Sequence, residues 1–259
     1  MARQPLEATV TRRGDAIVVR PAGLLDVSTA PYMRDVLVKA IADAPSVVIV
    51  DLDRLELRKT YTLSIFTVVA RRTAEWSGVP LVLVAGPDLG DRIRAHARAI
   101  ARFIPVCPTI DAALATARQP VQRRITRLRL GEHPYVVATA RRLVAATCEF
   151  WDCPEVVEDA VAITSELVSN AIVYAGTESE LRLEWRRDVL SVSLVDGSPR
   201  PPVLHPSNGY DNLSGGFGLR IVDALASAWG WVPHSGGGKV VWAVMRIRPR
   251  DGGGSRNGG

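Results

Sequence analysis

An acid and an amide four residues apart are the strongest candidates for chemistry in this sequence. Apolar residues spaced three and four apart predict a helix that begins after Pro154 and runs to about Tyr174. This apolar stripe, which we expect to be buried, consists of Ala160, Ile163, Leu167, Ala171 and Tyr174. Glu166 and Asn170 are neighbours on another face of the same helix. A carboxylate beside an amide can orient a water or hydroxyl and can bind a hard cation such as Mg²⁺ through oxygen. A polar surface pair is the alternative interpretation.

A second candidate group follows a predicted strand over residues 190–195, whose side chains alternate between apolar and polar. Asp196 and Gly197 come directly after this strand and open a loop rich in proline, glycine and asparagine. A carboxylate at a strand end is well placed to bind the edge of a nucleotide base. The alternative interpretation is an ordinary aspartate in a turn before glycine.

A third candidate group is the segment over residues 215–220, which reads Gly-Gly-Phe-Gly-Leu-Arg and opens a helix predicted to end near Trp229. Glycines let a backbone approach phosphate closely, and the first N–H groups of a helix are available to an anion. An asparagine-bearing helix, a strand-end aspartate and a glycine-led helix, in this order, together indicate a nucleotide site.

The segment Ser165–Ala171, which reads SELVSNA, resembles the N-box of the GHKL ATPase superfamily, and in particular its anti-sigma-factor serine-kinase branch. In that family the asparagine binds Mg²⁺ and the glutamate is the general base, so the resemblance assigns these roles to Asn170 and Glu166. Asp196 matches the family's aspartate that accepts a hydrogen bond from the adenine amino group. The resemblance implies a Bergerat-fold α/β sandwich that binds Mg-ATP. The other nucleotide-binding residues that it implies are Gly197, Gly216, Gly218, Leu219 and Arg220.

The sequence departs from that family in the adenine loop. The family's loop commonly reads Asp-x-Gly-x-Gly, whereas residues 196–200 read Asp-Gly-Ser-Pro-Arg, without the downstream glycines. This departure bears on ATP turnover more than on ATP-binding ancestry. It leaves open three interpretations: a protein serine/threonine kinase, a non-catalytic module whose affinity for a partner is gated by ATP, and a degenerate domain that binds no nucleotide.

The first half of the chain alternates strands and helices, with buried strands predicted at Ser46–Leu52 and Leu81–Ala85. This order predicts an α/β fold with a mostly parallel sheet. The opening segment Arg20–Asp26, together with the two buried strands and the helices that follow them, resembles a STAS domain of the anti-sigma-factor-antagonist type. The resemblance covers about residues 8–118 and implies a domain that docks on a protein partner.

The phosphorylated serine of such antagonists has no counterpart here. That serine lies in an Asp-Ser-Ser-Gly-like segment at a helix start, and the aligned residues 59–62 read Lys-Thr-Tyr-Thr. A lysine replaces an aspartate at the start of a helix, against the usual preference for negative charge there. We interpret this half as a partner-binding module that has lost the phosphorylation switch, although Thr60 keeps a hydroxyl and leaves phosphorylation open.

These patterns predict two domains, an α/β STAS-like domain over residues 1–118 and an α+β ATPase-like domain over residues 125–250. The second half places two successive helices before its strands, as in an α+β sandwich. A polar, proline-containing linker is expected at residues 119–124, and a glycine-rich disordered tail at residues 251–259.

Composition narrows the functional classes. The net charge of +5 is spread over both halves, which disfavours direct binding to nucleic acid. The three cysteines are sparse and unpaired in spacing, as in a reduced cytosolic protein, and no apolar run approaches the roughly 18 residues of a membrane span.

We therefore expect a cytoplasmic bacterial partner-switching regulator that binds Mg-ATP and phosphorylates a regulatory protein. The resemblance implies an anti-sigma antagonist, an anti-sigma factor or a sigma factor as the partner. It also implies a homodimer, since related kinases often dimerise.

Overall fold

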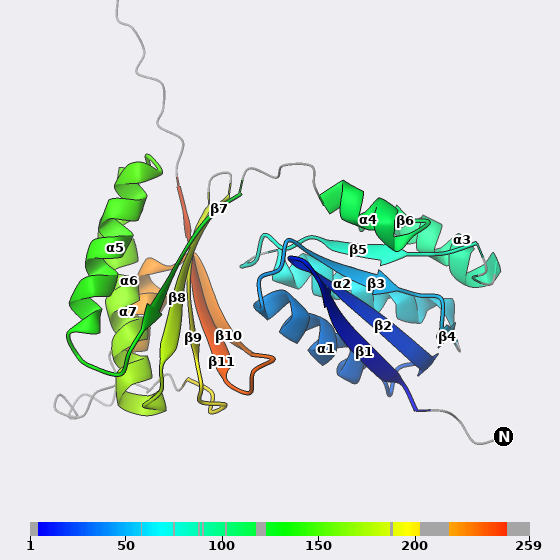
Figure 1. The fold of residues 1–259 in the computed structure, drawn as a ribbon, viewed down its shortest axis with the longest axis horizontal. Helices are drawn as coiled ribbons and strands as arrows, with labels where there is room; N and C mark the ends of the chain where they lie inside the picture. Colours follow the sequence, from blue (N-terminus) through cyan, green and yellow to red (C-terminus); the bar gives the residue numbers. More distant parts are fainter. Residues whose placement is uncertain are drawn as a thin grey trace, which may run out of the picture. The chain divides into compact units, whose positions relative to one another are not determined.

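The computed structural model describes residues 5–57, 59–74, 76–87, 89, 91–101, 103–117, 123–186, 189–202 and 218–247. The chain divides into two compact units, one of residues 1–121 and 231–240 and the other of residues 122–230 and 241–259. The described residues form two separate β-sheets (Figure 1). Among the described residues, no helix is long and apolar enough to cross a membrane.

The first sheet has the strand order β1-β2-β3-β5-β6, with β4 paired to β2. Among the described residues, β1 and β2 pair antiparallel, whereas the pairs β2–β3, β2–β4, β3–β5 and β5–β6 are parallel, which confirms the predicted mostly parallel sheet. The short strand β4 was not predicted, because three residues are too few to show a periodic pattern. The strands are β1 (Glu7–Arg13), β2 (Ala16–Leu25), β3 (Val47–Asp51), β4 (Leu55–Leu57), β5 (Leu81–Val84) and β6 (Val106–Cys107).

Helices cover both faces of this sheet. In Figure 1, α1 (Ala30–Ala42) and α2 (Ser64–Thr73) lie on one side of the sheet and α4 (Ile110–Ala117) on the other. A further helix, α3, spans Asp91–Ile100. The valines and isoleucine of β3 are fully buried, since each face of the strand meets a helix layer.

The second sheet has the order β10-β11-β9-β8-β7, and β8 pairs antiparallel with both β7 and β9. Helices α5 (Val136–Phe150), α6 (Val157–Asn170) and α7 (Gly218–Leu225) pack on one face of it (Figure 1), and buried residues from helices and strands form one core. The strands are β7 (Arg123–Leu130), β8 (Ser179–Arg186), β9 (Val189–Asp196), β10 (Ala228–Pro233) and β11 (Lys239–Arg246).

Two boundaries in this half differ from the sequence prediction. The helix expected to reach Trp229 ends at Leu225, and Trp229 belongs to β10, which was not predicted. The chain turns into the sheet because the Ser227 N–H donates to the Val244 carbonyl at 2.8 Å, so pairing between strands overrides the local helical pattern. Strand β7 begins at Arg123, inside the predicted linker, since residues 123 and 124 pair with the end of β8. Residues 118–122 of the linker region and the tail over 251–259 lie outside the described residues.

Candidate functional site

Helix α6 holds Glu166 and Asn170 on a rigid base. The apolar stripe from Ala160 to Ala171 is buried against the core, while Glu166 and Asn170 are half-buried on another face, as the spacing predicted. Ser165, also buried, accepts a hydrogen bond from the Arg141 guanidinium of α5 at 2.5 Å. The acid and the amide are therefore carried by a helix whose orientation is fixed by packing and by a link to α5.

The helix changes geometry directly after Asn170. Residues Ala171–Ala175 form a π turn, closed by the Gly176 N–H, which donates to the Ala171 carbonyl at 3.0 Å. Gly176 has φ +58°, a conformation that glycine adopts without strain. The wider turn rotates Tyr174 out of the apolar stripe, so Tyr174 is 58% exposed and its predicted burial is wrong.

The start of α7 meets the acid and the amide. A Cβ atom placed on Gly218 would overlap the Glu166 carboxylate and would lie 3.5 Å from Asn170 Nδ2. Any larger residue would displace the end of the Glu166 side chain, whereas a Cβ would make only ordinary van der Waals contact with Asn170. Three residues that the sequence singled out, Glu166, Asn170 and Gly218, thus come together where the start of α7 meets α6.

The other residues of the glycine-led segment have different places. Leu219 is 6% exposed and packs in the core, where it anchors α7. Arg220 is exposed on α7. Gly216 lies outside the described residues.

Asp196 is the last residue of β9 and is 5% exposed. Its Oδ1 accepts a hydrogen bond from the Ser198 N–H at 2.9 Å, the local turn that the alternative interpretation of this aspartate expects. The Gly197 N–H donates to Thr177 Oγ1 at 2.9 Å, and a Cβ on Gly197 would lie 3.1 Å from Thr177 Cγ2. Thr177 follows the π turn, so the segment after α6 holds the Asp196–Gly197 turn. No sequence pattern singled out Thr177, because this contact joins two elements.

The donor set that α6 presents beside Gly218 is one carboxylate and one amide. Carboxylate and amide oxygens suit Mg²⁺, and a Cβ would fill the space that Gly218 leaves beside them. Among the described residues, no group of three or more His, Cys, Asp or Glu side chains could hold a metal ion. Mg²⁺ is usually bound through one or two protein oxygens together with substrate phosphates, which is the arrangement this donor set supports.

In the segment aligned with the phosphorylated serine of antagonists, the Thr62 hydroxyl is buried and is a poor phosphate acceptor. Residues Thr60–Leu63 form a 3₁₀ turn before α2, and Thr62 is 6% exposed. The Thr62 hydroxyl donates to the Lys59 carbonyl at 2.6 Å and lies 3.4 Å from the Leu25 carbonyl. The side chain of Thr60 lies outside the described residues.

Two of the three cysteines, Cys148 and Cys153, are poor candidates for nucleophiles. Cys148 and Cys153 are both fully buried, and the Cys153 thiol donates to the Cys148 carbonyl at 3.5 Å. Burial, and secondarily the neighbouring Cys153, raises the pKa of Cys148 to about 12. Burial also raises the pKa of Cys153. Since the thiolate is the reactive form, neither group is activated at neutral pH.

Comparison with known proteins gives structural neighbours only. No family model and no curated protein matches the sequence. An anti-sigma factor antagonist from Mycobacterium paratuberculosis is similar to 44% of the chain, over 95% of its own length, with 26% identity and a TM-score of 0.36. The structure of the RsbU and RsbW domains of a Mycobacterium tuberculosis protein is similar to 49% of this chain. The match covers 33% of that structure's length, with 19% identity and a TM-score of 0.37. A variant of RsbS from Moorella thermoacetica is similar to 43% of this chain. The match covers 94% of the RsbS chain, with 16% identity and a TM-score of 0.35. Each likeness covers less than half of the chain, so the functional argument rests on the site residues.

The burial of two thiols predicts their reactivity. In the folded protein at pH 8, a thiol reagent such as DTNB should titrate only the partly exposed Cys107 rapidly. Cys148 and Cys153 should react only after denaturant is added, because their folded-state pKa values are raised. These two thiols do not change the free energy of unfolding below about pH 8.5, the ordinary pKa of a thiol. Above it the unfolded chain loses thiol protons that the folded protein retains, so the free energy of unfolding should fall as the pH rises toward the folded-state pKa. Rapid reaction of all three thiols in the native protein would contradict this description.

Proposed function

We propose that this chain is a bacterial partner-switching regulator whose C-terminal half binds Mg-ATP and phosphorylates a serine or threonine of a regulatory protein. The observation that carries the proposal is the approach of the Gly218 backbone to Glu166 and Asn170. It supports a site in which one helix supplies an acid and a metal-binding amide, and the start of another supplies N–H donors. Anions are stabilised at such helix starts.

In this proposal each side chain has one task. The Asn170 amide oxygen would bind Mg²⁺, and the first N–H groups of α7, from Gly218 onward, would face the phosphates. When bound, Mg²⁺ neutralises charge on the phosphoryl group that is transferred. The Glu166 carboxylate would accept the proton of the attacking hydroxyl, the role of a positioned general base.

The turn at the end of β9 would bind the adenine. Asp196 would accept a hydrogen bond from the adenine amino group, and Gly197 would keep the backbone close because Thr177 holds it. Because Gly197 has no side chain, its backbone could lie close to a planar base beside the strand end. The N-terminal half would dock on a partner protein, such as an anti-sigma antagonist, an anti-sigma factor or a sigma factor. The burial of the Thr62 hydroxyl supports docking without a phosphorylation switch at that residue.

The turn that follows β9, from Asp196 to Ser198, favours a second function. One oxygen of Asp196 already accepts the Ser198 N–H, and the loop lacks the downstream glycines of the kinase family. ATP would then order the site and change the affinity for a partner without phosphoryl transfer. Incubation with labelled ATP and candidate STAS-domain partners separates the two functions, because only a kinase produces a labelled phosphoprotein.

Replacement of Asn170 tests nucleotide binding. Asn170→Ala should weaken Mg-ATP binding by about tenfold or more, since it removes a contact to a charged ligand worth about 1.5 kcal/mol or more. Isothermal titration calorimetry measures the effect, and Glu158→Ala, an exposed change on the first turn of the same helix, is the matched control. Absence of binding by the wild type would remove both the kinase and the ATP-gated function.

Replacement of Glu166 tests transfer separately from binding. Glu166→Ala should lower phosphoryl transfer by about 10²- to 10⁴-fold, the usual contribution of a general base, and should leave Mg-ATP binding in place. The readout is labelled phosphate on a partner, with Glu158→Ala again as the control. Transfer at the wild-type rate by Glu166→Ala would show that this carboxylate is not the base.

Replacement of Gly218 tests the contact between the two helices. In Gly218→Ala the new Cβ displaces the flexible end of Glu166, so transfer should fall while the protein remains folded. The stability should change by no more than about 1 kcal/mol, because alanine suits a helix better than glycine. Gly131→Ala, where a Cβ meets open space, is the control and should leave both properties unchanged. Equal transfer by Gly218→Ala and the wild type would contradict a working contact between Gly218 and Glu166.

A further inference from the structure

Strand β7 is an edge strand of the second sheet. All eight of its residues pair with β8, and within the described part of the chain the strand order ends there. In an antiparallel edge strand, alternate residues direct their N–H and C=O groups away from the sheet. The outer side of β7 can therefore pair with the backbone of another extended segment.

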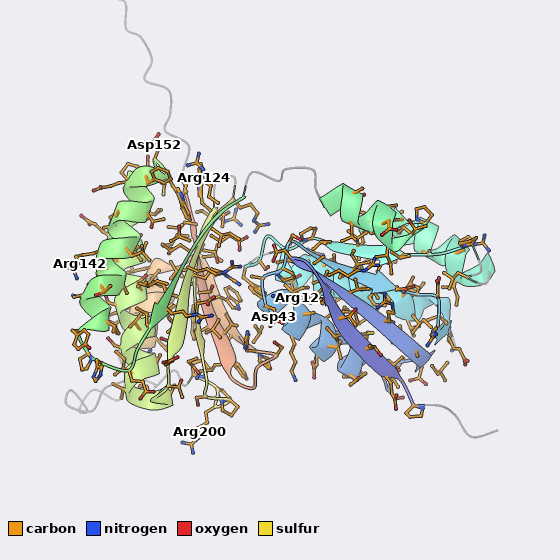
Figure 2. All side chains as sticks on the ribbon, viewed as in Figure 1. Arg12, Asp43, Arg124, Arg142, Asp152 and Arg200 are labelled. Atoms are coloured by element: carbon orange, nitrogen blue, oxygen red, sulfur yellow. The ribbon has the colours of Figure 1, made fainter. Side chains whose placement is uncertain are left out.

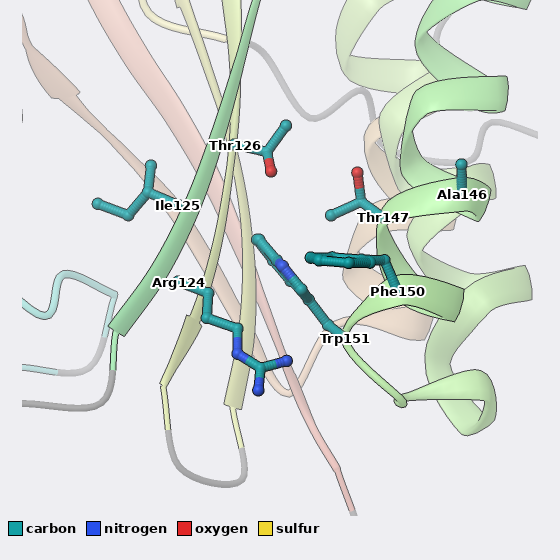
Figure 3. A pocket seen from close by; sticks show the side chains of 7 residues that line it. All are labelled: Arg124, Ile125, Thr126, Ala146, Thr147, Phe150 and Trp151. Carbon is teal, nitrogen blue, oxygen red and sulfur yellow. The ribbon is translucent and has the colours of Figure 1, made fainter.

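A pocket of about 690 Å³ opens beside this edge, between β7 and the end of α5 (Figure 3). The Thr126 side chain of β7 and the Thr147 side chain of α5 face each other across it, with the rings of Phe150 and Trp151 beside them. Trp151 is buried, whereas Phe150 is 82% exposed, a large apolar ring left in water at the rim. The pocket thus offers an apolar side chain a place next to the free backbone edge.

The edge is strongly basic. Strand β7 contains four arginines, at positions 123, 124, 127 and 129, and no acidic residue, and the pocket lining adds no acid. The Arg124 guanidinium lies over the ring of its cross-strand partner Trp185, 4.6 Å from the ring centre, and remains exposed at the pocket. Arg127 lies 3.8 Å from Glu180, and Arg129 is exposed. The charge favours an acidic occupant.

The same arginines argue against a second copy of this chain as the occupant. Antiparallel pairing of two β7 edges would place arginines opposite or diagonal to arginines, and like charges across strands are destabilising. An acidic segment gains attraction from those positions instead. Charge complementarity therefore selects a different protein.

We propose that the outer edge of β7 and its neighbouring pocket bind an extended, acidic peptide segment of a partner protein. The peptide backbone extends the sheet beyond β7, and an apolar peptide side chain enters the pocket between Thr147 and Phe150. The acidic side chains of the peptide alternate with the apolar ones and therefore lie on the opposite face of the sheet, where Arg129 is exposed, while Arg124 adds positive charge at the rim of the pocket. None of the pocket residues belongs to the candidate nucleotide site, so this surface works whether or not the chain binds ATP.

The first test uses two labelled peptides of roughly ten residues, enough to cover β7, one alternating glutamate and leucine and the other lysine and leucine. Fluorescence anisotropy at low salt should show about tenfold or tighter binding of the glutamate peptide, a difference of about 1.4 kcal/mol. Raised salt should weaken it, because exposed charges are screened. Two further glutamate peptides carry N-methyl groups, one on the odd-numbered and one on the even-numbered residues. One of the two should not bind, because its methyl groups replace the N–H hydrogens that pair with β7.

Protein variants locate the site. Arg124→Glu combined with Arg129→Glu should reverse the preference between the two peptides, and Phe150→Ala should weaken the glutamate peptide. Arg142→Glu is the matched charge control, because Arg142 is an exposed arginine on the outer side of α5, away from β7 (Figure 2). Circular dichroism confirms that each variant is folded.

Three results would overturn the proposal. One is equal binding of both peptides, or no binding by the wild type. Another is binding that resists N-methylation or the arginine variants. The third is a dimer in sedimentation analysis that Arg124→Glu with Arg129→Glu strengthens, which would assign the edge to a second copy of the chain.

Discussion

The close approach of the Gly218 backbone to the Glu166 carboxylate and the Asn170 amide ties the start of α7 to the middle of α6. The packing around it makes this approach possible. The apolar stripe of α6 fixes that helix on the sheet, and Leu219, the next residue after Gly218, is buried in the same core. A side chain at position 218 would displace the carboxylate end of Glu166. The candidate site therefore depends on a glycine at position 218, between two helices whose positions are determined by the core.

The π turn after Asn170 has two consequences for the same region. It ends the regular helix at the residue proposed to bind Mg²⁺, and it directs the following chain toward the end of β9. There Thr177 receives the Gly197 N–H and holds the turn that carries Asp196. The two candidate groups, one at α7 and one at β9, are thus both supported by the single segment from Glu166 to Thr177. Wide helical turns are frequent at functional sites, and here the turn supplies a change of direction that a regular helix would not give.

The C-terminal half offers two surfaces of different chemistry. The candidate nucleotide site combines oxygen donors with helix N–H groups, whereas the β7 edge combines a free backbone, arginines and an aromatic rim. The residues that line the one do not line the other. Binding at one surface therefore leaves the residues of the other accessible. The N-terminal sheet adds a third surface, with its turn at residues 59–62 closed by the buried Thr62 hydroxyl.

Local sequence determined what depends on one element at a time. The four-residue spacing placed Glu166 and Asn170 side by side, and continuous β-branched runs predicted the buried strands β3 and β5. Tertiary structure decided the rest. Pairing with β11 turned Trp229 from a helix into β10, and the π turn exposed Tyr174 against its helical phase. Gly218 meets Glu166, and Thr177 meets Gly197, across separations of 52 and 20 residues. Periodicity describes which face of a helix or strand is apolar, but contacts between elements follow from how those faces pack together, and that information is spread over the whole chain.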